Sequence, residues 1–135
     1  MGFKVERIGS ANRPDGGIDI IAWPPKTEFP YLIAVQAKHH RDMSLKTGVR
    51  TVRDLRGTIS NIPVDIGVVV TNTTFTANAR WVANQYPRII RLRDISDLAR
   101  WLLKDYLQDK DLKAFPEKIK IAPGVSISIP LEPLI

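Results

Sequence analysis

Apolar and charged residues alternate at residues 3–8, Ile18, Ile20 and Ala22 alternate with Asp19 and Ile21, and a mainly apolar run that also indicates a strand follows at residues 32–38. Alternation with a period of two predicts β-strands with one face toward a core. Three prolines lie in the connection 23–31, which favours a hairpin-like link between the second and third strands. The chain therefore begins with three predicted strands.

Helical periodicity follows at residues 48–60, where Val52, Leu55, Ile59 and Ile62 fall on one face. Residues 65–71 then form a short, mainly apolar run rich in β-branched residues, which predicts a central strand covered on both faces. The spacing thus changes from strand to helix and back to strand.

A second helix is predicted over residues 77–86, after a stretch rich in hydroxyls that can cap it. Its expected buried stripe is Ala79, Val82, Ala83 and Tyr86. Residues 88–92 predict another strand, and Asp94 caps a helix whose expected core stripe is Ile95, Leu98, Leu102 and Tyr106. The order β-β-β-α-β-α-β-α predicts an α/β fold. Its mixed sheet is flanked by helices, antiparallel at the start and parallel at the end.

The pattern divides the chain into a core at residues 1–104 and a C-terminal extension at 105–135. In the extension, apolar and polar residues alternate strictly at 125–129, and this stretch is flanked by Gly124 and Pro130. The pattern predicts an edge strand or an arm. Its apolar face needs a partner, either within the chain or in a second subunit.

Charge distinguishes the two parts. The formal charge is +6, and residues 1–104 carry 16 Lys and Arg against 9 Asp and Glu. This excess favours a polyanionic partner such as nucleic acid.

The chain has no cysteine and only two histidines, which excludes disulfides and makes zinc a poor candidate. The longest apolar run is far too short to span a membrane, so we expect a cytoplasmic protein.

Three polar side chains are expected to meet where the second and third strands pair. Gln36 and Lys38 share one face of their strand, and Asp19 reaches the same face across the hairpin. A carboxylate and an amide oxygen suit a hard cation such as Mg²⁺, and an adjacent lysine can stabilise charge on a phosphate. Each residue also has a structural interpretation: a turn Asp, a hydrogen-bonded amide, or the solvated end of a strand.

These residues resemble the PD-(D/E)xK nuclease superfamily. Asp15-Gly16-Gly17-Ile18-Asp19, Gln36-x-Lys38 and Val70-Thr71…Phe75-Thr76…Ala79 together are similar to its Mrr-type restriction endonuclease branch, over residues 3–103. The resemblance implies a restriction-endonuclease-like fold and a DNA endonuclease that uses Mg²⁺, with Mn²⁺ as a possible substitute. Asp19, Gln36 and Lys38 would be catalytic, and the metal would be held by Asp19, Gln36 and the backbone carbonyl of Ala37. Restriction of foreign or modified DNA is the implied role. Cutting both strands with so small a domain would require two active sites, which a homodimer would supply.

One departure from the family is the absence of a first helix that usually carries an acidic active-site residue, because the sequence starts about two residues before the first strand. The chain is then a fragment, another element replaces the helix, or the site is degenerate. Glu6 is a candidate replacement, against a solvated strand residue.

The segment 38–56 carries six Lys or Arg against two Asp. The residues expected to contact DNA phosphates are Arg41, Lys46, Arg50 and Arg53. The alternative is a solvated face, partly paired with Asp54.

Two other functions remain open. One is a nuclease fold that no longer cuts and serves as a binding domain of a larger assembly. The other is a structure-specific nuclease on branched DNA or RNA.

Overall fold

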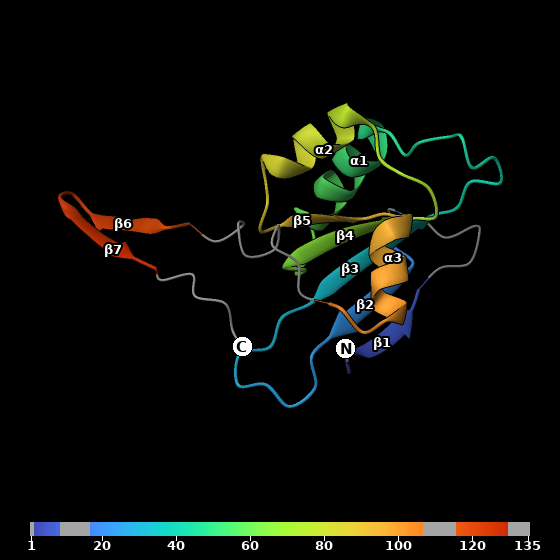
Figure 1. Cartoon of the computed structure of the whole chain (residues 1–135). Helices are drawn as coiled ribbons and strands as arrows, with labels where there is room; N and C mark the ends of the chain where they lie inside the picture. The colour runs from blue at the N-terminus through green and yellow to red at the C-terminus, as the bar shows by residue number, and fades with distance from the viewer. Residues whose placement is uncertain (1, 9–16, 107–115, 130–135) are drawn as a thin grey trace.

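A five-stranded mixed sheet forms the centre of the molecule (Figure 1). The structure is a computed structural model and describes residues 2–8, 17–106 and 116–129. The strands, which follow the chain order across the sheet, are β1 (Lys4–Arg7), β2 (Ile20–Trp23), β3 (Ile33–Lys38), β4 (Ile66–Thr71) and β5 (Ile90–Arg93). The first three pair antiparallel, and β3, β4 and β5 pair parallel. The predicted α/β class and mixed sheet are confirmed.

Two helices, α1 (Val49–Ile59) and α2 (Ala77–Asn84), pack on the same face of the sheet (Figure 1). Six of the eight predicted stripe positions are buried there, and Val52 and Leu55 are fully inaccessible to solvent. Tyr86, just beyond the end of α2, is half-buried. The two helices meet the sheet at Ala34 and Val69, whose side chains point to this face by strand alternation. Ile62, which we expected in the core, lies beyond the end of α1 and is 37% exposed.

The opposite face of the sheet is covered less completely. The helix α3 (Ile95–Leu102) lies on this side, and its Trp101 lines an open, largely apolar cavity of about 890 Å³ with the strand residues Val35 and Val68. The residues of β4 that point to this face are only half-buried. The expectation that this strand is covered on both faces is therefore wrong among the described residues.

The expected core stripe of α3 is wrong at Ile95 and Leu102, while Leu98 and Tyr106 are half-buried. Ile95 is 45% exposed and Leu102 is 87% exposed, while the helix instead buries Asp97. The reason lies at the helix start. Asp94 caps the helix, and Asp97 returns a hydrogen bond to the Asp94 backbone N–H. The reciprocal cap holds Asp97 in a buried position at the helix start, and Leu102 at the other end of the helix is exposed.

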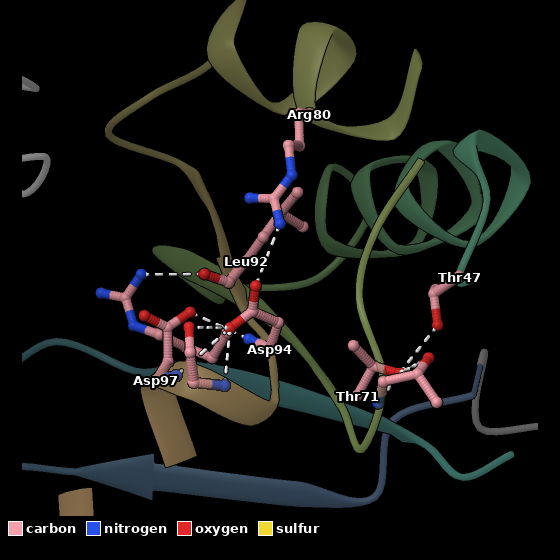
Figure 2. A network of polar contacts seen from close by, with 9 residues as sticks. Thr47, Thr71, Arg80, Leu92, Asp94 and Asp97 are labelled. Carbon is pink, nitrogen blue, oxygen red and sulfur yellow. Dashed lines mark hydrogen bonds and ion pairs between the residues drawn. The ribbon is translucent and has the colours of Figure 1, made fainter. Parts of the chain in front are cut away.

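Asp94 also joins three elements (Figure 2). Its carboxylate lies 3.0 Å from the Arg80 guanidinium of α2. Burial alone would raise its pKa, but hydrogen bonds from Ser96, Asp97 and Arg80, with the charge of Arg80, outweigh it and lower the pKa to about 2. The backbone N–H of Ile95 donates to Thr73, so the cap ties α3 to the segment that precedes α2.

The C-terminal extension contains a separate hairpin of β6 (Lys118–Ala122) and β7 (Val125–Ser128), which stands away from the sheet in Figure 1. The predicted strand thus pairs within the chain as an arm and is not an edge of the main sheet. None of the helices in the described part of the chain is long and apolar enough to cross a membrane.

Candidate functional site

Asp19 meets the end of β3 immediately before β2 begins. Ile20 pairs with Val35, so continuing the register by one residue places Asp19 opposite Gln36. The Asp19 carboxylate accepts a hydrogen bond of 2.7 Å from the backbone N–H of Ala37, and the Asp19 N–H donates to Val35. Hydrogen bonds to the backbone of Val35 and Ala37, on either side of Gln36, therefore fix Asp19 against the Gln36-x-Lys38 segment. Asp15 and Gly16 lie outside the described residues.

Gln36 is buried, with 6% of its surface exposed, beside this carboxylate. Its Oε1 atom has no hydrogen-bond partner within residues 2–8, 17–106 and 116–129. A buried amide oxygen without a partner is unfavourable, because it has lost its water and gained nothing in return. This oxygen is therefore available to coordinate a cation or to accept a hydrogen bond from a ligand.

Gly17 leaves the space that the Gln36 side chain occupies. Its φ of +80° lies in the left-handed region, and a Cβ built on it would sit 2.6 Å from Gln36 Nε2. Glycine is needed here for two independent reasons, the backbone conformation and the close approach. Sequence reasoning used this glycine only as part of the family pattern and did not assign it this role.

Lys38 ends β3 and is exposed, opposite Thr71 at the end of β4. The chain beyond it is held by Asn72, whose side-chain amide bonds both the N–H and the C=O of His40, each at 2.8 Å. The Asn72 side chain thereby extends the β3–β4 pairing past the last strand residue. Asn72 was not singled out from the sequence, since nothing in the pattern distinguished it from a loop asparagine.

A buried chain of hydroxyls lies next to this exit. His40 Nε2 is 3.0 Å from Thr47 Oγ1, which donates to Thr71 Oγ1 at 2.9 Å, as Figure 2 shows for the two threonines. Thr47 and Thr71 are 2% and 1% exposed. Capping was the role we expected for the hydroxyls of the 71–76 stretch. Thr76 does cap α2, by accepting from the Ala79 N–H, whereas Thr71 instead ties the end of β4 to the segment before α1.

The four predicted DNA contacts fall in two places. Arg41 and Lys46 are exposed on the loop that follows Lys38, whereas Arg50 and Arg53 are exposed on α1. Arg50 lies 3.8 Å from Asp54, but its side chain is 94% exposed, so this pair holds it only weakly.

The donors at this site suit a hard cation better than a soft one, because they are a carboxylate and a neutral amide oxygen. In the described part of the chain, no group of three or more His, Cys, Asp or Glu side chains could hold a metal. Of the three candidate ligands, Asp19, Gln36 and the Ala37 carbonyl, only Asp19 would bring a carboxylate to an ion. Glu6 pairs with Ile21 in the β1–β2 register, two residues along the strand from Ile8, whose N–H donates to the Asp19 carbonyl.

A family model described as restriction endonuclease, Mrr_cat, matches residues 1–102. No curated protein sequence gives a significant match. Among solved structures, a protein of unknown function, AF1548, superposes with a TM-score of 0.58 at 18% identity, covering 81% of this chain and 58% of that one.

Two further structures are restriction enzymes. The DNA modification-dependent restriction endonuclease AspBHI gives a TM-score of 0.58 at 20% identity, covering 78% of this chain and 26% of that one. MspJI, in complex with a 27-mer oligonucleotide, gives 0.53 at 19% identity, covering 84% and 27%. This chain thus spans about a quarter of each enzyme, and the likeness shows a shared fold. With the family model covering the core and the fold agreeing, the chain belongs to the Mrr-type restriction endonuclease family.

Proposed function

We propose that this protein is a Mg²⁺-dependent endonuclease that hydrolyses phosphodiester bonds in DNA, with Mn²⁺ as a substitute ion. The observation that carries the proposal is the pairing of the Asp19 carboxylate with the Ala37 N–H beside the unpartnered Oε1 of Gln36. Family membership supports nuclease chemistry, and the basic excess of residues 1–104 supports a polyanionic substrate.

Asp19, Gln36 and the Ala37 carbonyl would hold the cation, and Lys38 would act on the substrate. When bound, the ion supplies Lewis-acid polarisation of the phosphate. Because one Asp19 oxygen already accepts from Ala37, the other oxygen remains for an ion. The Lys38 ammonium stabilises the negative charge that develops as water attacks phosphorus and the bond to the leaving sugar oxygen breaks. A neutral Gln36 provides less charge than a carboxylate, so ion binding should be weak.

Plasmid cleavage by the full chain tests this proposal, with Mg²⁺ or Mn²⁺ against a chelator and on methylated and unmethylated DNA. Lys38→Ala should abolish cleavage with little loss of DNA affinity, because phosphate contacts are spread over many cations. Lys120→Ala, which removes an exposed lysine from the polar face of the β6–β7 hairpin, is the matched control and should cut normally. Cleavage that survives Lys38→Ala would show that the site is assigned wrongly.

A second candidate is a nuclease-fold domain that binds DNA without cutting it. Within the described residues, no group of three or more His, Cys, Asp or Glu side chains could hold a metal, and this favours the alternative. Calorimetric titration with Mg²⁺ separates the two. The nuclease requires ion binding that Asp19→Asn removes, whereas a binding domain requires salt-sensitive DNA affinity that is unchanged by the ion.

A further inference from the structure

The loop that joins β3 to α1, residues 39–48, leaves the sheet at the edge where Lys38 ends its strand (Figure 1). Two apolar side chains in this β3–α1 loop are turned to solvent, Met43 with 60% and Leu45 with 52% of their surface exposed. Single exposed apolar residues are ordinary. Here two lie together, five and seven positions after the lysine that would face the phosphate.

Hydrogen bonds hold this loop in one conformation. The Asp42 carboxylate accepts from the N–H and the hydroxyl of Ser44, at 2.9 and 2.7 Å, and the Asp42 carbonyl accepts from the Leu45 N–H. Asn72 fixes His40 and lies 3.6 Å from the Met43 sulfur. Met43 and Leu45 are therefore presented by an ordered backbone, and little conformational entropy is lost when they bind.

The charges of the loop fit a polyanion. Arg41 and Lys46 are exposed on either side of the apolar pair. The one acidic residue between them is Asp42, whose carboxylate is engaged within the loop, and its hydrogen bonds from Ser44 lower its pKa. An apolar tip flanked by cations can contact phosphates with its sides and place its centre against the bases.

We propose that Met43 and Leu45 form a wedge that enters the base stack of duplex DNA, while Arg41 and Lys46 hold the flanking phosphates. Met and Leu are among the side chains that proteins insert between base pairs, where they unstack and kink the duplex. The wedge rests on the proposed function in one respect, that DNA is the ligand. Beside Lys38 it would distort the step next to the bond that is cut, so the substrate of this site is a kinked duplex.

The test measures DNA distortion separately from cleavage. Full-length Lys38→Ala protein is titrated onto duplexes that carry 2-aminopurine at successive positions, because the fluorescence of this base rises when it is unstacked. We expect a severalfold rise at one or two adjacent positions. The same rise should be absent when Met43→Ser and Leu45→Ser are added. The matched control is Leu102→Ser with Leu103→Ser, two leucines that are 87% and 81% exposed at the end of α3, and it should leave the rise intact.

The salt dependence of DNA affinity separates the contribution of the apolar wedge from that of the cations Arg41 and Lys46. Arg41→Ala and Lys46→Ala should each lower the slope of log affinity against log salt by about 0.9, whereas Met43→Ser with Leu45→Ser should leave the slope unchanged. A mismatch at the distorted step should tighten binding of the intact loop and give no gain to the double serine variant, since a mismatch makes unstacking cheaper.

Failure of the wedge and failure of the nuclease give different results. A fluorescence rise that persists in the Met43→Ser, Leu45→Ser protein overturns the wedge, even if cleavage depends on Lys38. Cleavage that survives Lys38→Ala overturns the catalytic assignment and leaves a Met43-dependent rise standing. Absence of any DNA binding by the wild-type chain overturns both.

Discussion

Gly17 shows how one residue without a side chain controls the chemistry of its neighbour. Its positive φ and the 2.6 Å approach to Gln36 Nε2 leave no room for a methyl group. The buried Gln36 side chain can keep its place beside Asp19 only while position 17 is glycine. The requirement is thus imposed by the candidate site and by the backbone together.

Gly17→Ala should therefore lower both stability and Mg²⁺ affinity. Alanine in the left-handed region costs about 1–2 kcal/mol, and the new Cβ must displace the Gln36 amide. Urea denaturation and calorimetric Mg²⁺ titration measure the two effects. Gly57→Ala is the control, since a Cβ there meets nothing within 4 Å and the residue lies inside α1. It should stabilise the protein by about 0.5–1 kcal/mol. An unchanged Mg²⁺ affinity in Gly17→Ala would contradict the role assigned to Gln36.

At the scale of the elements, Asp94 links α2, β5 and α3 through its cap and its ion pair with Arg80 (Figure 2). Because its pKa falls from 3.8 to about 2 on folding, its ionised form stabilises the native state. The contribution is fully present above pH 4 and is lost as pH falls through about 2. From the size of the shift, it amounts to about 2 kcal/mol at neutral pH.

Asp94→Asn should lower the free energy of unfolding by about 1–2 kcal/mol at pH 7, since asparagine still caps the helix but no longer carries the charge that attracts Arg80. The difference from wild type should shrink toward zero near pH 2. Urea denaturation at a series of pH values measures it. Asp54→Asn, which removes the exposed partner of Arg50, should change stability by less than about 0.5 kcal/mol. A constant difference across the pH range would mean that the charge of Asp94 is not what stabilises the cap.

The elements also show what the sequence could predict. Alternation and helical spacing placed five strands and three helices, because each pattern reflects which side chains must be buried against the sheet. The meeting of Asp19 with the Gln36 segment followed from the same alternation. The buried face of α3 could not be predicted, since a reciprocal cap turned Asp97 inward. The Asn72 clamp depends on a contact between residues 32 positions apart, which local pattern does not encode.

At the scale of the whole molecule, the sheet core and the β6–β7 hairpin are connected but pack separately. The buried core consists of residues from the sheet, α1 and α2 and the segments that join them, and every residue of the hairpin strands is exposed. A hairpin of two strands is marginally stable alone, so it can add little to the stability of the core. This agrees with the division that we predicted between a core at residues 1–104 and an extension at 105–135, which remains a prediction.

A chain that ends after Tyr106 should therefore unfold in a single transition at the same urea concentration as the full chain. Its free energy of unfolding should agree with that of the full chain within about 0.5 kcal/mol. This end point keeps Asp105, which pairs with Arg100 at the end of α3. The matched comparison is a chain that ends after Leu92, which removes α3 and the Asp94 cap that binds Arg80. That chain should lose several kcal/mol or fail to fold. If ending at Tyr106 were as damaging as ending at Leu92, the extension would be part of the same folding unit as the core.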